Sequence, residues 1–289
     1  AGRRAYTDFY RKNMNKNNVF EPFKSAKWIK NGSDNKNVIV FRKTFPTNDI
    51  AGKVFLSICG LGFYDAYLNG KRVGDDYFKP AFVDYEKRDY KKNPSLGYKG
   101  KHVVYCNEYE VSSMLESGEN VLEVFVGNGY YRNDDKETEP FVSYGEKKLI
   151  FALRSDDGTL FAVSDETSEV ADTGYYSDLF SGDRRDFCRK DLEWSFSVKA
   201  KKVSGTFKIQ PIPNDKVEKI IYPIAEKIVN GGVLYDFGIN HSGGIEMIIR
   251  GNKGCKVEIF YAETLLKNGM PNMETARWND IGGDGQPVY

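Results

Sequence analysis

Short apolar runs separated by turn residues recur along most of the chain. The runs at 38–45, 54–59 and 121–126 are rich in β-branched and aromatic residues, and Gly, Pro or Asn follows them. Runs of this length and composition predict β-strands. No segment of ten or more residues keeps a 3.6-residue period, so the sequence predicts few and short helices. Further strands are expected at 63–68, 103–106, 149–153, 160–163, 233–237, 244–250 and 256–261.

Turn signals join these runs into hairpins. Asn69-Gly70 follows one apolar run and precedes a short return strand, which is typical of a two-residue hairpin turn. Residues 156–159, Asp-Asp-Gly-Thr, mark a second turn. Many short strands joined in this way predict an all-β fold made of two consecutive antiparallel β-sandwiches, jelly-roll-like, with few short helices.

The chain of 289 residues is long enough for two domains. Residues 1–26 are polar and rich in Asn, Lys and Arg, and we expect an N-terminal extension or arm there. We expect the first sandwich at 27–198 and the second at 199–289. Whether the second sandwich is truncated at its C-terminal end stays open.

The charge balance is almost even, with 42 basic and 41 acidic side chains. An even balance gives no overall field that would attract nucleic acid or an anionic membrane, so we expect neither partner. No run approaches 18 apolar residues, so no membrane span is predicted. The first ten residues lack the apolar core of a signal peptide. This favours the cytoplasm slightly and otherwise leaves the compartment open.

The four cysteines, Cys59, Cys106, Cys188 and Cys255, form no C-x-x-C pair. The only two histidines lie 139 positions apart, at 102 and 241, so a structural zinc site is not expected. Cys59 lies in an apolar run and is interpreted as a buried thiol. The sequence therefore favours four reduced cysteines.

A catalytic centre is not recognisable from the residues alone. Glycoside hydrolysis needs two carboxylates across a cleft, but adjacent acidic pairs such as Asp75-Asp76 and Asp156-Asp157 are common in a chain with 41 acidic residues. No G-x-S-x-G nucleophile motif and no glycine-rich phosphate loop is present.

One loop carries a candidate binding site. It follows the strand at 121–126, and its oxygen-bearing side chains are Asn128, Asn133, Asp134 and Asp135, with Tyr130 beside them. Calcium prefers such oxygen ligands, and aromatic rings can stack on sugars, so the loop is a candidate sugar or calcium site. It lacks the spacing of an EF-hand, and a solvated loop is the alternative interpretation.

Two stretches resemble a known family. GLGFYDAYLNGKRVGDDYFKPAFVDYEKRDY at 60–90, followed by YEVSSMLESGENVLEVFVGNGYY at 109–131, closely resembles the N-terminal, galactose-binding-like sandwich of bacterial α-L-rhamnosidases of glycoside hydrolase family 78. LYDFGINHSGGIEMIIRGNKGCKVEIFYAETLLKNG at 234–269 is similar to the family's next, concanavalin-like sandwich. Tyr130 stands where the family usually has Trp, and Asp183 where it has Glu.

This resemblance implies a function. In the family the sandwiches precede an (α/α)₆ barrel that holds the acid and base glutamates of an inverting mechanism. We therefore expect this chain to be a non-catalytic N-terminal fragment of an α-L-rhamnosidase, with the barrel as its partner in cis. Glu263, in a predicted strand, is interpreted as a structural or interdomain carboxylate.

An alternative function is left open by the resemblance. Some relatives bind rhamnose through calcium in a sandwich of this kind. The chain would then be a carbohydrate-binding module that recognises L-rhamnose or a related sugar in a glycan, with calcium as its cofactor. No other cofactor is expected.

Overall fold

The structure is a computed structural model. It describes residues 21–48, 52–83, 85, 103–132, 143–179, 182–188, 191–203, 205–229 and 231–276. Strands dominate, and the helices among these residues are the 3₁₀ turns η1 (Glu21–Phe23), η4 (Ser112–Met114) and η5 (Met273–Ala276). The predicted all-β fold class is confirmed. None of the helices described has the length and apolar character needed to cross a membrane.

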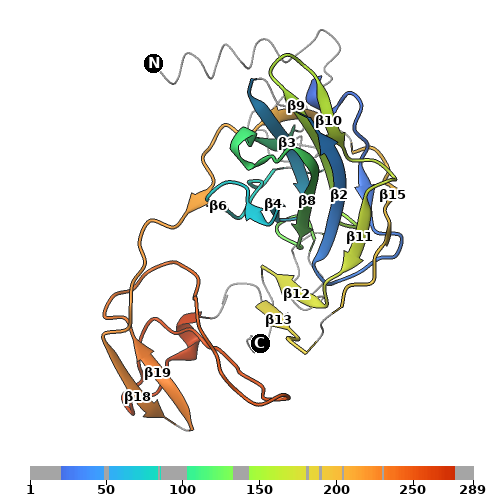
Figure 1. The fold of residues 1–289 in the computed structure, drawn as a ribbon. Helices are drawn as coiled ribbons and strands as arrows, with labels where there is room; N and C mark the ends of the chain where they lie inside the picture. The colour runs from blue at the N-terminus through green and yellow to red at the C-terminus, as the bar shows by residue number, and fades with distance from the viewer. Residues whose placement is uncertain are drawn as a thin grey trace, which may run out of the picture.

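Two sheets pack face to face and form a sandwich (Figure 1). The first runs in the order β15-β1-β9-β3-β7-β16, with β10 on β9, and the second in the order β14-β11-β2-β8-β4-β5. The first sheet consists of β1 (Ile29–Lys30), β3 (Val54–Leu61), β7 (Val103–Glu110), β9 (Lys148–Ser155), β10 (Leu160–Val163), β15 (Val198–Lys199) and β16 (Thr206–Ile209). The second consists of β2 (Ile39–Thr47), β4 (Tyr64–Leu68), β5 (Lys71–Arg72), β8 (Gly118–Val126), β11 (Glu169–Asp172) and β14 (Ser195–Phe196).

The main core lies between the two sheets. Because side chains alternate along a strand, Leu56 and Ile58 of β3 face the second sheet, and Phe41 of β2 and Phe151 of β9 fill the same layer. Each of these side chains is at most 1% exposed. The apolar runs that predicted β2, β3, β8 and β9 therefore form the centre of the sandwich.

A second core covers the outer face of the first sheet. Cys59 and Leu61 of β3 point to this face and are fully buried. Phe23 and Trp28, from the start of the described chain, cover it by packing on Phe207 of β16, with ring centroids 5.0 and 5.9 Å away. The sheet is thus buried on both faces, which explains why β3 is apolar at almost every position.

The predicted turn between β4 and β5 is confirmed. Asn69 and Gly70 both have positive φ values, 52° and 74°, as a tight two-residue hairpin requires. The Asn69 side chain also accepts a hydrogen bond from the Val121 backbone N–H at 2.9 Å, which ties the turn to β8. All four cysteines are free in this structure, and Cys59 is buried, as predicted; Cys106 is buried as well.

Three two-stranded sheets complete the described structure: β12 (Tyr175–Asp178) with β13 (Gly182–Arg185), β6 (Asp76–Tyr77) with β17 (Asp215–Lys216), and β18 (Ala225–Val229) with β19 (Gly232–Asp236). The strand predicted at 233–237 corresponds to β19. Figure 1 shows β18 and β19 apart from the two large sheets.

The strands predicted at 244–250 and 256–261 are wrong. These residues adopt no regular secondary structure, and Glu263 lies in a bend rather than on a strand. A β-strand needs hydrogen bonds from a neighbour, and among the described residues no ladder reaches either segment. The apolar pattern alone therefore did not determine the structure of this region.

Candidate functional site

Two glycine-containing loops meet at one end of the sandwich. The loop after β3 and the loop after β8 are joined by a hydrogen bond from the Gly127 N–H to the Phe63 carbonyl at 2.8 Å. A Cβ on Gly62, which has φ +111°, would lie 1.9 Å from the Gly127 oxygen. A Cβ on Gly129, at φ +53°, would lie 2.5 Å from the Phe63 nitrogen. Only glycine allows the two loops to approach this closely.

Asn128 is directed into the protein and is 1% exposed. Its amide nitrogen donates to Asp178 Oδ2 at 3.0 Å, and its Oδ1 accepts from Lys147 Nζ at 3.1 Å. Lys147 is also buried and donates to the Asn35 carbonyl at 2.6 Å. A calcium ion at Asn128 Oδ1 would have to displace the Lys147 ammonium.

Arg132 fixes the far end of the same loop. Its guanidinium is largely buried and forms a two-pronged ion pair with the Asp34 carboxylate. The hydrogen bond from Arg132 holds the pKa of Asp34 below its usual value. Residues 128–132 are therefore anchored at both ends to the segment around Asn35.

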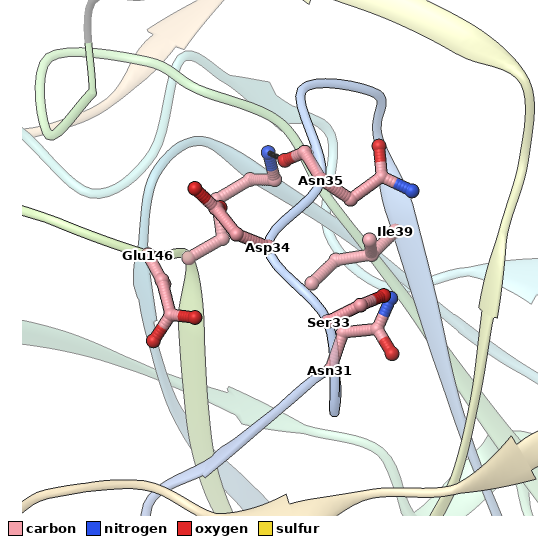
Figure 2. A pocket seen from close by; sticks show the side chains of 7 residues that line it. Asn31, Ser33, Asp34, Asn35, Ile39 and Glu146 are labelled. Carbon is pink, nitrogen blue, oxygen red and sulfur yellow. Dashed lines mark hydrogen bonds between the residues drawn. The ribbon is translucent and has the colours of Figure 1, made fainter.

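A small polar hollow lies beside this anchor (Figure 2). Its lining residues are Asn31, Ser33, Asp34, Asn35, Ile39, Glu146 and Lys147. The carboxylates of Asp34 and Glu146 are paired with Arg132 and Lys30. Within the described ranges, no group of three or more acidic, cysteine or histidine side chains is arranged to hold a metal ion.

An exposed aromatic surface lies next to the two loops. We define it as Phe63, Phe78, Phe82 and Tyr130. The Tyr130 ring meets Phe63 and Phe82 edge-on, with centroids 5.1 and 5.5 Å apart, and Phe78 lies 5.6 Å from Phe63. Phe78, Phe82 and Tyr130 are 57%, 51% and 38% exposed. Rings from three separate segments thus form one continuous apolar surface.

The backbone of Phe78 has an unusual conformation. Its φ is +50°, a left-handed value that costs a residue with a side chain about 1–2 kcal/mol. Its neighbour Lys79 points the other way and is fully buried, with its ammonium 2.7 Å from the Asp76 carboxylate. The loop at 74–82 therefore exposes the Phe78 ring on one side, while the buried ion pair of Lys79 with Asp76 anchors its backbone on the other.

Asp76 and Glu108 are two largely buried acidic groups, and each has a cationic neighbour. Asp76 accepts hydrogen bonds from Lys79 at 2.7 Å and from the Tyr109 hydroxyl at 2.9 Å. Glu108 accepts from Ser57 at 2.7 Å and has Arg154 at 3.6 Å, and burial raises its pKa. Because Glu108 and Tyr109 are consecutive on β7, the two carboxylates lie on opposite faces of the sheet.

The structure brings only part of the predicted site together. Tyr130 is exposed, Asn128 is buried, and Asn133, Asp134 and Asp135 lie outside the described residues. Sequence reasoning missed Arg132 and Lys147, which hold the loop. The glycines at 62, 127 and 129 were the signal that could have revealed the contact between the loops.

Two packed, mainly antiparallel sheets, with glycine-rich loops and an aromatic surface at one end, define an all-β sandwich module. The model of the family "Alpha-L-rhamnosidase N-terminal domain" matches residues 50–93 and 95–225, which is more than half of the chain. The chain belongs to this family. The resemblance to the N-terminal sandwich of family 78 enzymes is thereby confirmed.

The curated relatives are much longer proteins. An α-L-rhamnosidase of Formosa agariphila is 28% identical over 249 residues, which cover 79% of this chain and 25% of the relative. An α-L-rhamnosidase of Streptomyces avermitilis is 26% identical over 257 residues, covering 79% and 23%. The chain thus spans about a quarter of the length of these relatives.

Solved structures share the fold. The α-L-rhamnosidase of Dictyoglumus thermophilum aligns with a TM-score of 0.70 at 24% identity, over 86% of this chain and 29% of that one. The Aspergillus terreus enzyme aligns with a TM-score of 0.58 at 20% identity, over 75% of this chain and 26% of that one. The Streptomyces avermitilis enzyme, solved with L-rhamnose, gives 0.53 at 22% identity, over 66% and 19%.

Proposed function

We propose that this chain is the non-catalytic N-terminal region of an α-L-rhamnosidase. The observation that carries the proposal is the family match over residues 50–93 and 95–225, in a chain that corresponds to about a quarter of its relatives. The parent enzyme would hydrolyse terminal α-L-rhamnosides with inversion. Its catalytic acid and base would come from an (α/α)₆ barrel in the same polypeptide. The sandwich would pack against this barrel and stabilise it.

The arrangement of buried carboxylates supports a non-catalytic role. An inverting glycosidase needs two carboxyl groups about 6.5–9.5 Å apart across one cleft, with room for water between them. Asp76 and Glu108 lie on opposite faces of the first sheet, and each has a cation beside it. They cannot act on the two sides of one sugar ring.

A glycosidase assay tests this proposal. The purified 289-residue chain is incubated with 4-nitrophenyl α-L-rhamnoside, and a full-length relative serves as the positive control. We expect release of nitrophenol by the relative and none by the chain. Turnover by the chain that the Asp76→Asn or Glu108→Gln variant abolishes would contradict the proposal.

A second candidate function is carbohydrate binding, and the aromatic surface favours it. Phe78, Phe82 and Tyr130 are between 38% and 57% exposed, on loops that are fixed by close contacts. L-Rhamnose carries a methyl group and ring C–H groups that fit an aromatic face. The aromatic surface can bind the sugar by stacking, which needs no calcium. The oxygen ligands in the loop after β8 would instead bind the sugar through a calcium ion.

Calorimetric titration with L-rhamnose, with and without calcium, separates these modes. Heat that is independent of calcium and is lost in Tyr130→Ala supports the aromatic surface. Heat that requires calcium supports the loop. Phe187→Ala, which truncates a 77% exposed ring on another part of the chain, is the matched control and should bind as the parent chain does. No heat under either condition would contradict sugar binding.

A further inference from the structure

The segment that leaves the sandwich is held by buried polar contacts. After β16, the chain continues through Gln210, which is 4% exposed, and then forms β17, which pairs with β6. Gln210 Oε1 accepts from the Ala81 N–H at 2.7 Å, and its Nε2 donates to the Ile212 carbonyl at 2.9 Å. The exit segment, residues 210–216, therefore contacts the aromatic loop, residues 74–82, along its length.

The Asp76 carboxylate lies at the centre of these contacts. Its Oδ1 accepts from Lys79 Nζ, and its Oδ2 accepts from the Tyr109 hydroxyl and from Asn214 Nδ2. One carboxylate thus joins the aromatic loop, strand β7 and the exit segment. Gly74 makes room for it, because a Cβ there would lie 2.7 Å from Asp76 Oδ1.

Water cannot easily replace these contacts. Lys79 is fully buried, and Asp76 is its ion-pair partner. Separating the two therefore leaves a buried charge without its counter-charge. Hydrogen bonds to a charged acceptor are also stronger than those between neutral groups. In contrast, the neighbouring pair of Asp75 with Lys216 is exposed at both side chains and is screened by solvent.

We propose that Asp76, Lys79 and Asn214 form a clasp that holds the aromatic loop and the exit segment as one cooperative unit. When the clasp opens, both segments open together. While the clasp is closed, the residues after 216 are joined to the sandwich through a fixed junction and not through a flexible linker. A partner that binds Phe78 or Phe82 is thereby coupled to the position of the exit segment. This proposal goes beyond the proposed function and holds whether or not the chain binds sugar.

The test is hydrogen exchange of the 289-residue chain, followed by mass spectrometry. The Asn214→Asp variant keeps an acceptor for Gln210, removes the donor to Asp76 and places a second carboxylate beside it. We expect exchange to rise about tenfold or more in both 74–82 and 210–217, as loss of a hydrogen bond to a charged group predicts. Strand β2 should be unchanged.

The control is Asp75→Asn, which removes the carboxylate of the exposed Asp75–Lys216 pair next to Asp76 and leaves the buried contacts of Asp76 in place. It should leave the exchange of 74–82 unchanged. If Asn214→Asp speeds exchange only in 210–217, or in neither segment, the clasp is refuted. If exchange also rises in β2, the sandwich itself has opened. The Asn214→Ala variant, which adds no charge, is then measured. Faster exchange in both 74–82 and 210–217 supports the clasp, and faster exchange in only 210–217, or in neither segment, refutes it.

Discussion

The sandwich and the region at 211–276 have similar apolar patterns but very different structures. In the sandwich, strands such as β2, β3 and β9 have neighbours on both sides and bury their apolar residues. From 211 to 276, no described residue is buried, and Ile248, Ile228 and Tyr222 are 88%, 80% and 78% exposed. The difference shows that an apolar pattern gives a tendency to form strands, whereas burial needs a second layer.

The β18–β19 hairpin shows this most clearly. Its two strands pair with each other and with no other described strand. An isolated two-stranded hairpin is at best marginally stable in water. Contiguous exposed apolar side chains, such as those of Ile228 and Val233, are also typical of surfaces that pack against another partner.

The largest difference between the regions should appear on truncating core residues. Phe151 is 1% exposed and lies between the sheets. We expect Phe151→Ala to lower the free energy of unfolding by about 3–5 kcal/mol, because it leaves a cavity. Ile248→Ala, at an 88% exposed residue, should change it by less than about 0.5 kcal/mol. Urea unfolding followed by tryptophan fluorescence measures both, and equal losses would break the comparison.

A smaller difference should appear at glycines with positive φ. Gly62→Ala combines a left-handed backbone with a collision against the Gly127 carbonyl, so we expect a loss of about 2 kcal/mol or more. Gly254 also has positive φ, +89°, but nothing lies near its missing Cβ. Gly254→Ala should therefore cost only the backbone contribution, about 1 kcal/mol, in the same assay. An equal cost at both positions would show that the close approach of the two loops is unimportant.

The smallest expected effect is a difference in acid sensitivity. Burial raises the pKa of Asp76, but the hydrogen bond and charge of Lys79, with Asn214 and Tyr109, outweigh it, and the pKa lies below its usual value. A carboxyl of this kind stabilises the fold above its ordinary pKa and loses that contribution as pH falls through the lower, folded-state value.

Unfolding measured at a series of pH values below about 4 tests this expectation. We expect the Asp76→Asn variant to be less stable at neutral pH, because Lys79 then lacks its counter-charge. Its stability should nevertheless fall less steeply on acidification than that of the parent chain. Parallel curves would contradict the role assigned to the Asp76 carboxylate.

Much of the sandwich could be predicted from the sequence, since its central strands are continuous apolar runs and its turn at Asn69-Gly70 has a specific backbone requirement. The edge strand β14 could not, because it is short and both of its residues are exposed. Burial of Lys79 could not be predicted either, because residues 74–82 mix charged, aromatic and turn residues without a regular apolar period. Its burial depends on Asp76 and on Asn214, which lies 135 positions further along the chain.

The candidate site was predicted in part. Tyr130 was identified, but Phe63, Phe78 and Phe82 were not, because their rings meet only when three separate segments fold together. Asn128 was identified as an oxygen ligand, whereas its amide is engaged by Lys147 and Asp178. Side-chain type suggested the chemistry, and only the fold decided which side chains face solvent.

Amide hydrogen exchange across the whole chain tests the comparison most directly. We expect slow exchange in β2, β3, β8 and β9 and fast exchange throughout 218–276, including 244–250 and 256–261. Slow exchange in those last two segments, at rates matching the central strands of the sandwich, would show that they are paired strands with a core of their own and would contradict this account.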